Sequence, residues 1–180
     1  MRIAKQRLRN RVQTHRVAKI EHAMRTLSKR TQYALRALYA LTRRGSTKPA
    51  LIGDLSKEED IPKKFLEQIL LQLKQKGLVD SRRGRYGGYV LTAEPDKVSI
   101  GSIIRMIDGP IAPLPCASES KFRKCDECPD IRFCGTRILM RQVRDATTDI
   151  LDRTTLADIC NKVDAARLEA EQGEEIMYYI

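Results

Sequence analysis

The sequence predicts a mainly α-helical protein with one small β-hairpin and one long helix toward its C-terminal end. Three observations support this fold class. Apolar residues recur at helical spacing between positions 62 and 77, a glycine-rich basic segment follows between two short apolar runs, and residues 135–152 carry a broad apolar stripe without proline. At 180 residues, the chain can form one domain with an appendage or two small domains.

The helix predicted after Pro62 has one face for the protein core and one for a partner. We assign to the core face the apolar residues Phe65, Leu66, Ile69, Leu70 and Leu73. The opposite face is polar and comprises Lys64, Glu67, Gln68 and Gln75. Leu71 falls in the middle of this polar face, where it either touches a thymine methyl or packs beneath the following hairpin. Pro62 suits the first turn and Gly77 suits a left-handed stop, so both helix ends are marked.

The predicted hairpin has an arginine-rich tip. Its two apolar runs, 78–79 and 89–91, flank the segment Arg82-Arg83-Gly84-Arg85-Tyr86-Gly87-Gly88, whose glycines permit a tight turn. A bounded helix followed by a basic hairpin is the order of the recognition helix and wing in a winged helix-turn-helix domain. We expect the helix to enter the major groove of DNA through Lys63, Lys64, Glu67 and Gln68. We expect the wing to hold the minor groove or phosphates through Arg82, Arg83 and Arg85.

Further helices complete this domain, which we place at residues 24–110. Apolar spacing predicts a core helix at 28–44 and a short helix at 51–57, before the recognition helix. After the wing, isoleucines at helical spacing predict a helix at 100–107 that ends at Gly109.

Composition points to a nucleic-acid partner. The net charge is +11, from 34 basic and 23 acidic residues, and favours nucleic acid over a membrane surface. No apolar run approaches the length of a membrane span, so we expect a cytoplasmic protein without a membrane partner.

Residues 1–23 form a basic extension, which we expect to be disordered. It could follow DNA phosphates, or translation could begin at Met24 instead. Both histidines, His15 and His22, lie in this extension, so the folded body offers no histidine as a catalytic base. The sequence therefore argues against an enzyme.

Residues 111–134 form a cysteine-rich loop. The loop is polar and buries too little apolar surface to order itself. A metal centre would hold it in one conformation. Its thiols are candidate ligands for an iron–sulfur cluster or zinc: Cys116, Cys125, Cys128 and Cys134. A dithiol switch or unligated thiols remain as alternatives.

Four motifs in this order make residues 24–159 similar to the Rrf family of bacterial transcription regulators, of the IscR, NsrR and CymR type. The motifs are Tyr33-Ala34-Leu35-Arg36-Ala37-Leu38, Phe65-Leu66-Glu67-Gln68-Ile69-Leu70, Arg83-Gly84-Arg85-Tyr86-Gly87-Gly88-Tyr89 and Ile107-Asp108-Gly109-Pro110. The resemblance implies a homodimer that reads a palindromic operator in double-stranded DNA. It also implies a sensing loop between the winged domain and a long dimerisation helix, with a cluster on three loop cysteines and a fourth ligand that is not cysteine.

The sequence departs from that family pattern at the ligand positions. Phe122 stands where the family spacing would continue upstream of Cys128, and Arg137 stands where IscR-like members supply their fourth ligand. Gln32 stands roughly where NsrR-like members supply a carboxylate. An all-cysteine site is therefore the economical hypothesis, with the choice between a 2Fe-2S and a 4Fe-4S cluster left open and with zinc or no cofactor as alternatives.

We interpret residues 135–164 as the dimerisation helix and a following short helix, with intrachain packing as the alternative for the apolar stripe. The stripe comprises Ile138, Leu139, Val143, Ala146, Ile150 and Leu151. The short helix should run from Leu156 to Val163 and bury Cys160 as a small residue. The charged tail, 165–180, is expected to be helical before fraying and receives no role.

The sequence as a whole predicts a sequence-specific DNA-binding transcription regulator that senses iron–sulfur cluster, redox or nitrosative status through its cysteines. The alternative is a cluster-free or zinc-containing regulator with a thiol switch. Two other classes are a redox enzyme built on Cys125 and Cys128, for which no thioredoxin-like strand pattern is present, and a general nucleic-acid module with structural zinc.

Overall fold

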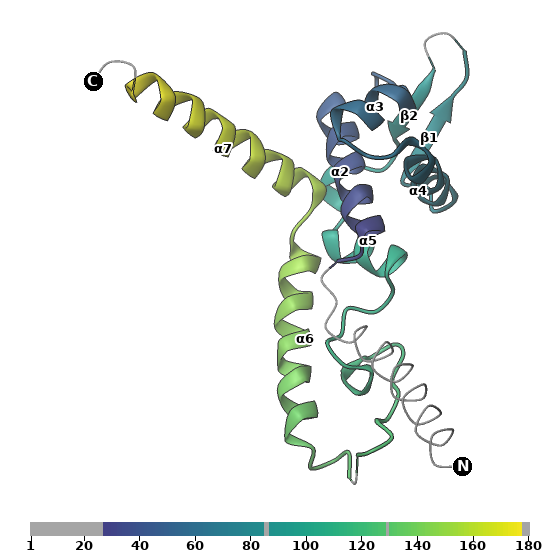
Figure 1. Cartoon of the computed structure of the whole chain (residues 1–180), viewed down its shortest axis with the longest axis vertical. Helices are drawn as coiled ribbons and strands as arrows, with labels where there is room; N and C mark the ends of the chain where they lie inside the picture. The colour runs from purple at the N-terminus through teal and green to yellow at the C-terminus, as the bar shows by residue number, and fades with distance from the viewer. Residues whose placement is uncertain (1–26, 85–86, 129, 178–180) are drawn as a thin grey trace, which may run out of the picture. The chain divides into compact units, whose positions relative to one another are not determined.

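The computed structural model describes residues 27–84, 87–128 and 130–177 (Figure 1). The predicted basic extension and Arg85 at the wing tip lie outside these residues. The described chain divides into two compact units. Among the described residues, the winged unit contains 29–109 and 149–177, and the cysteine unit contains 27–28 and 110–148.

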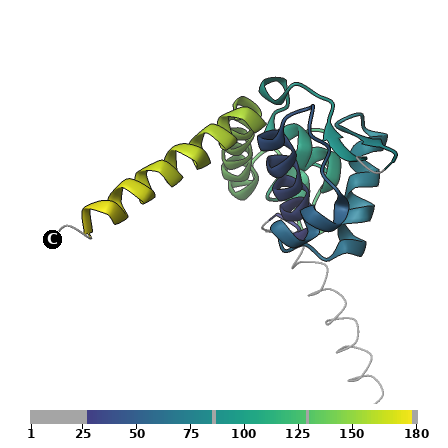
Figure 2. The same cartoon turned by 90° about the horizontal axis from the view of Figure 1, so that it is seen from above.

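Four helices and a hairpin build the body of the winged unit, which confirms the predicted fold class. The helices are α2 (Lys29–Arg44), α3 (Ile52–Glu58), α4 (Lys63–Gln75) and α5 (Ile100–Ile107). Figures 1 and 2 both show α2, α3 and α4 gathered beside the hairpin. Their core consists of side chains that are almost wholly buried: Leu38, Leu41, Leu55, Leu66, Ile69, Leu70, Leu73 and Ile103. This apolar core holds α4 by one face only.

The turn between α3 and α4 determines where α4 begins. The Ser56 hydroxyl donates to the Ile61 carbonyl oxygen at 2.7 Å, and the Ile61 N–H donates to the Ser56 carbonyl oxygen at 3.0 Å. Asp60 reverses the chain with a φ of +47°, a conformation that aspartate tolerates better than most residues. Ile61 is only 2% exposed and so anchors the turn in the core. Pro62 is the N-cap of α4, and Gly77 has the left-handed φ, +74°, expected of the residue that ends it.

Strands β1 (Val79–Arg82) and β2 (Gly88–Leu91) form the antiparallel wing, with Val79 opposite Leu91 and Arg82 opposite Gly88. The loop before α3 pairs with strand β2 of the wing through one isolated antiparallel bridge. The Ala50 N–H donates to the Tyr89 carbonyl oxygen, and the Tyr89 N–H donates to the Ala50 carbonyl oxygen, both at 2.8 Å. These two bonds fix the wing against the helices.

Gly88 makes the close approach between the wing and Ala50 possible. A Cβ at this position would lie 2.5 Å from the Ala50 carbonyl oxygen, and its φ of +140° disfavours other residues. Gly88→Ala should therefore lower the free energy of unfolding by about 2–3 kcal/mol, measured by chemical denaturation. Gly53→Ala in α3 is the control, because nothing lies within 4 Å of its Cβ position. Since alanine is the better helix former, that variant should gain about 0.5–1 kcal/mol, and equal losses in both variants would contradict this account of Gly88.

The chain returns to the winged unit through the end of helix α6 (Gly135–Arg153) and through helix α7 (Leu156–Met177). The Ile100 N–H donates to the Thr154 carbonyl oxygen at 2.8 Å, and the Leu156 N–H donates to the Val98 carbonyl oxygen at 3.0 Å. Helix α7 continues well past Val163, where we predicted a short helix to end. The alanine, leucine and glutamate residues that follow favour helix, and no proline interrupts them.

Reciprocal capping starts α7. The Thr155 hydroxyl accepts from the Asp158 N–H at 3.1 Å, and the Asp158 carboxylate accepts from the Thr155 N–H at 2.9 Å. These bonds hold the pKa of the Asp158 carboxyl below its usual value, because they stabilise the ionised form. Cys160 is buried in the winged unit, as predicted, and burial raises the pKa of its thiol.

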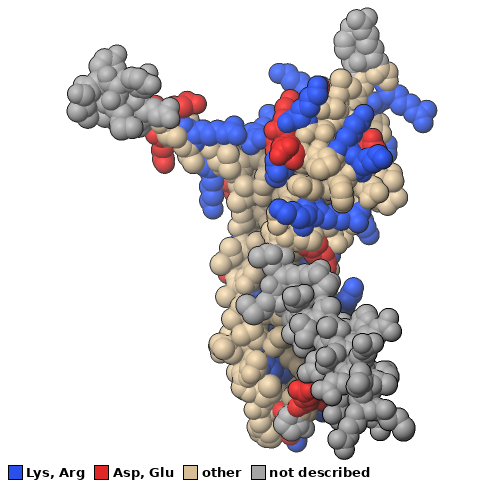
Figure 3. All heavy atoms as spheres, in the orientation of Figure 1, with Lys and Arg blue, Asp and Glu red and all other residues tan. Residues whose placement is uncertain are grey.

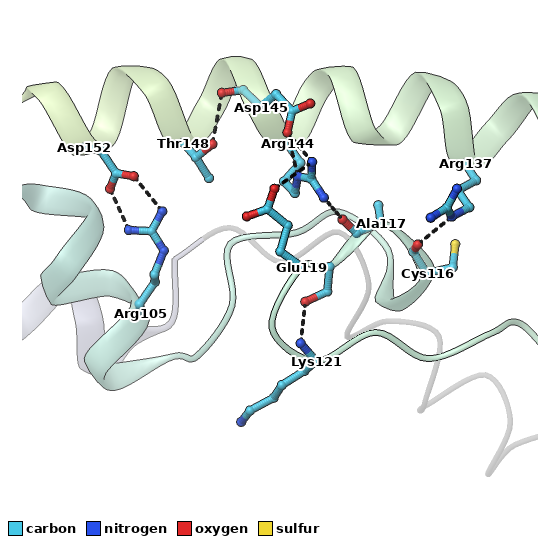
Figure 4. Close-up of polar contacts among 11 residues, drawn as sticks. Arg105, Cys116, Ala117, Glu119, Lys121, Arg137, Arg144, Asp145, Thr148 and Asp152 are labelled. Atoms are coloured by element: carbon cyan, nitrogen blue, oxygen red, sulfur yellow. Dashed lines mark hydrogen bonds and ion pairs between the residues drawn. The ribbon is translucent and has the colours of Figure 1, made fainter.

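A two-pronged ion pair ties the end of α6 to α5 (Figure 4). The Arg105 guanidinium donates to both Asp152 oxygens, at 2.6 and 2.8 Å. The bonds to Arg105 hold the pKa of the Asp152 carboxyl below its usual value. Gly101 leaves room for the pair, since a Cβ there would lie 2.0 Å from an Asp152 oxygen. No helix among the described residues is long and apolar enough to cross a membrane.

Candidate nucleic-acid interface and cysteine loop

The outward face of α4 presents polar side chains that the rest of the described chain leaves unoccupied. The side chains predicted to contact bases are all exposed, and among the described residues they form no hydrogen bonds or ion pairs: Lys63, Lys64, Glu67 and Gln68. Two lysine ammonium groups, a carboxylate and an amide are therefore free to bind an external partner. Their hydrogen-bonding groups match those on base edges and phosphates.

Two apolar residues of α4 also face outward. Phe65 is 58% exposed, so our assignment of this residue to the core was wrong. At 3.6 residues per turn, Phe65 lies about a quarter-turn from the centre of the buried stripe formed by Leu66, Ile69, Leu70 and Leu73, outside the part of the helix surface that they cover. Leu71 is 56% exposed and lies roughly opposite the stripe, so it does not pack beneath the wing.

The wing is fastened to α4 by a lysine. The Lys74 ammonium donates to the Ser81 hydroxyl at 2.6 Å and lies 2.9 Å from an Asp80 carboxylate oxygen. The hydrogen bond from Lys74 holds the pKa of the Asp80 carboxyl below its usual value. These contacts hold the base of the wing against α4, so the two elements present one continuous surface.

Two arginines of the wing extend from this surface. Arg82 donates to the Ser46 carbonyl oxygen at 3.4 Å, whereas the Arg83 side chain is exposed without a partner in the described part of the chain. Figure 3 shows blue lysine and arginine side chains around the helices and hairpin of the winged unit. The surface that combines α4 and the wing therefore has the charge required for a polyanion.

The four loop cysteines lie near one another in the cysteine unit, with hydrogen bonds linking Cys116 to Cys125 and Cys128 to Cys134. Cys116 is buried within the 3-10 turn η2 (Pro115–Ala117), and burial raises the pKa of its thiol, with a further rise from a hydrogen bond to Cys125. Partial desolvation raises the pKa of the Cys128 thiol, as does its neighbour Cys134.

These thiols are suitable ligands for a soft metal, but they are not gathered into one centre. Within the described ranges, no three cysteine, histidine or acidic side chains are arranged to hold a metal ion. An all-cysteine centre would therefore require the loop to rearrange until at least three of these neighbouring thiols converge on one point.

Two arginines of α6 hold the first turn of the loop (Figure 4). Arg137 Nε donates to the Cys116 carbonyl oxygen at 2.9 Å, and its guanidinium lies 5.8 Å from the centre of the Phe122 ring. Arg144 is buried and donates from Nη1 to the Ala117 carbonyl oxygen at 2.5 Å. Arg144 Nη2 also lies 3.1 Å from a Glu119 carboxylate oxygen.

Our sequence reasoning missed the role of these arginines. In the sequence, Arg137 stands out only as a residue that cannot bind metal, and Arg144 receives no role. Their spacing of seven residues was the available signal, because it places both side chains on one face of a helix.

A second face of α6 is apolar and exposed. The exposed fractions are 50% for Ile138, 53% for Leu139, 41% for Val143 and 65% for Ile150. No element among the described residues covers these side chains, so packing within the described part of the chain does not account for the stripe. A run of exposed apolar residues along one helix is typical of a protein–protein contact.

The fold and the basic surface define the class of the protein, a winged helix-turn-helix DNA-binding protein. The chain belongs to the Rrf2 family, described as iron-dependent transcriptional regulators, which its residues 27–162 match. It is a transcription regulator of the Rrf2 type, and its relatives are regulators rather than enzymes.

Curated relatives span most of the chain. An rrf2-like transcriptional regulator of Rhodobacter capsulatus is 42% identical over 74% of this chain and 91% of its own length. The regulator CymR of Bacillus subtilis is 32% identical over 86% of this chain and 99% of its own. The regulator IscR of Erwinia tasmaniensis is 28% identical over 75% of this chain and 78% of its own.

Solved structures agree with this assignment. The structure of CymR, the global cysteine regulator of B. subtilis, is 34% identical, has a TM-score of 0.64, and covers 77% of this chain and 98% of that one. T. potens IscR is 25% identical, has a TM-score of 0.62, and covers 79% of this chain and 90% of that one. The winged helix assignment is thus confirmed by comparison with two regulators of the family.

Proposed function

We propose that this regulator acts as a homodimer on a palindromic operator, with α4 in the major groove and the wing on the neighbouring minor groove or phosphates. The observation that carries the proposal is the exposed polar face of α4, whose side chains have no partner in the described chain, beside a basic wing fastened by Lys74. Binding chromosomal DNA also implies a cytoplasmic protein.

Two parts of this surface should have different tasks. Gln68 can form two hydrogen bonds with an adenine edge, which makes it a reader of sequence. Glu67 can accept from cytosine or repel bases that offer only acceptors. Arg83 is exposed on the basic wing and would contact phosphate or the minor groove, so it should contribute affinity for every sequence.

This division predicts different outcomes for two substitutions. Gln68→Ala should change which sequences the protein selects from a random DNA library. Arg83→Ala should weaken binding to all sequences alike and reduce the slope of log K against log salt by about one. The measurements are sequencing of selected DNA and binding titrations at several salt concentrations. Equal losses on every sequence for both variants would contradict the proposed division.

We further propose that the cysteine loop binds an iron–sulfur cluster through Cys116, Cys125, Cys128 and Cys134. The donor set supports this, because four thiolates suit a cluster of either common type. The family's description as iron-dependent and its IscR members support it as well. A cluster supplies a centre that oxidants, nitric oxide or iron shortage can destroy, and such a loss would report those conditions.

Hydrogen bonds connect the cysteine loop to α6, the proposed dimerisation helix. Arg137 and Arg144 bind carbonyl oxygens of Cys116 and Ala117, so a rearrangement of the loop must either move α6 or break these bonds. The end of the same helix is paired with α5 through Asp152 and Arg105. Cluster assembly or loss would thereby change the geometry with which a dimer presents its two copies of α4.

A thiol switch or a zinc site is the second candidate, favoured by the pairing of the thiols as Cys116–Cys125 and Cys128–Cys134. One related structure is that of the oxidised form of Staphylococcus aureus CymR. Iron, acid-labile sulfide and zinc analysis of anaerobically purified protein separates these candidates. We expect iron and sulfide in equal amounts with visible absorption, whereas zinc alone or no metal would exclude the cluster.

A further inference from the structure

Leu71 occupies an unusual place for an apolar side chain. It is 56% exposed and lies on the face of α4 that carries the proposed base-contacting groups. Gln68 precedes it by three residues and Lys64 by seven, and these are the spacings that bring side chains together on one helix face. The buried stripe of Leu66, Leu70 and Leu73 points to the other side. Leu71 is therefore surrounded by polar groups rather than by the core.

A single exposed leucine is common on protein surfaces and by itself indicates nothing. Leu71 differs from such a residue because its neighbours Lys64 and Gln68 are exposed and have no partner in the part of the chain that the structure describes. Any partner that engages these two side chains must also cover Leu71. Since the charged wing is fastened to the same helix, DNA suits this surface better than an apolar protein partner.

The major groove offers one apolar group among its base edges, the C5 methyl of thymine. Along a helix axis, Leu71 lies about 4.5 Å beyond Gln68, at 1.5 Å per residue. This displacement is close to the spacing of about 3.4 Å between successive bases on one strand. A helix that places Gln68 on one base pair therefore brings Leu71 to a neighbouring pair.

From this geometry we propose that Leu71 is a specificity-determining residue that recognises the C5 methyl of a thymine next to the base contacted by Gln68. The inference rests on the proposed use of α4 as the recognition helix. It deepens that function by naming an apolar contact for a helix face whose other groups form hydrogen bonds. The contact favours thymine over cytosine, which lacks the methyl group, at one position of each half-site.

The test removes the methyl from the DNA and the side chain from the protein. The wild-type, full-length chain selects duplexes from a random library, and each thymine of the selected site is then replaced in turn by deoxyuridine, which lacks only the C5 methyl. In each half-site, one such replacement, next to the base position whose selection Gln68→Ala alters, should weaken wild-type binding about fourfold. This factor corresponds to the free energy gained by burying one methyl-sized group. For Leu71→Ala, the same replacement should change affinity less than about twofold.

Leu168→Ala is the matched control, because Leu168 is a leucine of α7 with a similar exposure of 59%. This control should retain the full fourfold response to deoxyuridine. Alanine favours helix at either position, so both variants should remain folded. The inference is overturned if no deoxyuridine weakens the wild type, or if Leu71→Ala and the wild type lose the same factor at every thymine. Failure to select any sequence would instead overturn the proposed function, so the two failures are distinguishable.

Discussion

Replacing Leu139 and Ile150 together by lysine should convert the protein to a monomer and lower its affinity for the operator by at least about a hundredfold, the usual gain from linking two binding sites. Both residues belong to the exposed apolar stripe of α6, with exposed fractions of 53% and 65%. A dimer that buries this stripe cannot accommodate four unpaired ammonium groups. Because both side chains are exposed in the single chain, the winged unit should keep its fold. Sedimentation equilibrium and binding titrations measure the two effects.

The same substitution on another exposed leucine provides the control. Leu168→Lys on α7 adds one charge at a residue that is 59% exposed and lies outside the stripe, so the protein should remain a dimer with unchanged operator affinity. A double variant that still sediments as a dimer would contradict the role of α6. A monomeric variant that binds the full operator with wild-type affinity would contradict the requirement for two simultaneous contacts.

Cys134→Ser should remove nearly all bound iron and sulfide from anaerobically purified protein. A serine hydroxyl stays protonated at neutral pH and is a poor ligand for iron, whereas a thiolate is a good one. The neighbouring Cys128 thiol, whose pKa is raised in part by Cys134, would also lose its paired thiol. Metal analysis and visible absorption give the cluster content. Operator titrations with the variant then show whether loss of the cluster changes DNA binding.

Cys160→Ala is the control for cysteine loss, because Cys160 is buried in the winged unit and hydrogen-bonds only weakly, at 3.9 Å, to the Tyr39 carbonyl oxygen. That variant should keep the iron content of the wild type. If Cys134→Ser retained full iron and sulfide, the all-cysteine site would be wrong. If the serine variant lost its iron but bound the operator like the wild type, the cluster would have no regulatory effect on that operator.

Local sequence patterns were sufficient for the helices and hairpin of the winged unit. The stripe of Leu66, Ile69, Leu70 and Leu73 defines a buried helix face because side chains three and four residues apart lie together. Gly77, which ends α4, and Gly84 and Gly88 of the wing have positive φ values, which few other residues adopt. Phe65 escaped this reasoning because it lies at the edge of the stripe, where packing density rather than periodicity decides burial.

The cysteine unit was less predictable from sequence. The loop cysteines and their affinity for soft metals could be recognised from residue type alone. Their division into the pairs Cys116–Cys125 and Cys128–Cys134 depends on how the loop folds. Arg137 and Arg144 likewise looked like ordinary surface residues, because a bond from a guanidinium to a carbonyl oxygen leaves no mark in the composition of either segment.

The sequence by itself thus determined the class of protein, the extent of its recognition helix and the candidate ligands, because these follow from periodicity, charge and residue chemistry. Tertiary structure alone decided that Leu71 is exposed instead of packed beneath the wing, that Gly88 meets Ala50, and that Arg105 joins Asp152 from 47 positions away in the chain. Such contacts depend on how distant segments approach one another, and this approach is set by the packing of the whole core rather than by any local pattern.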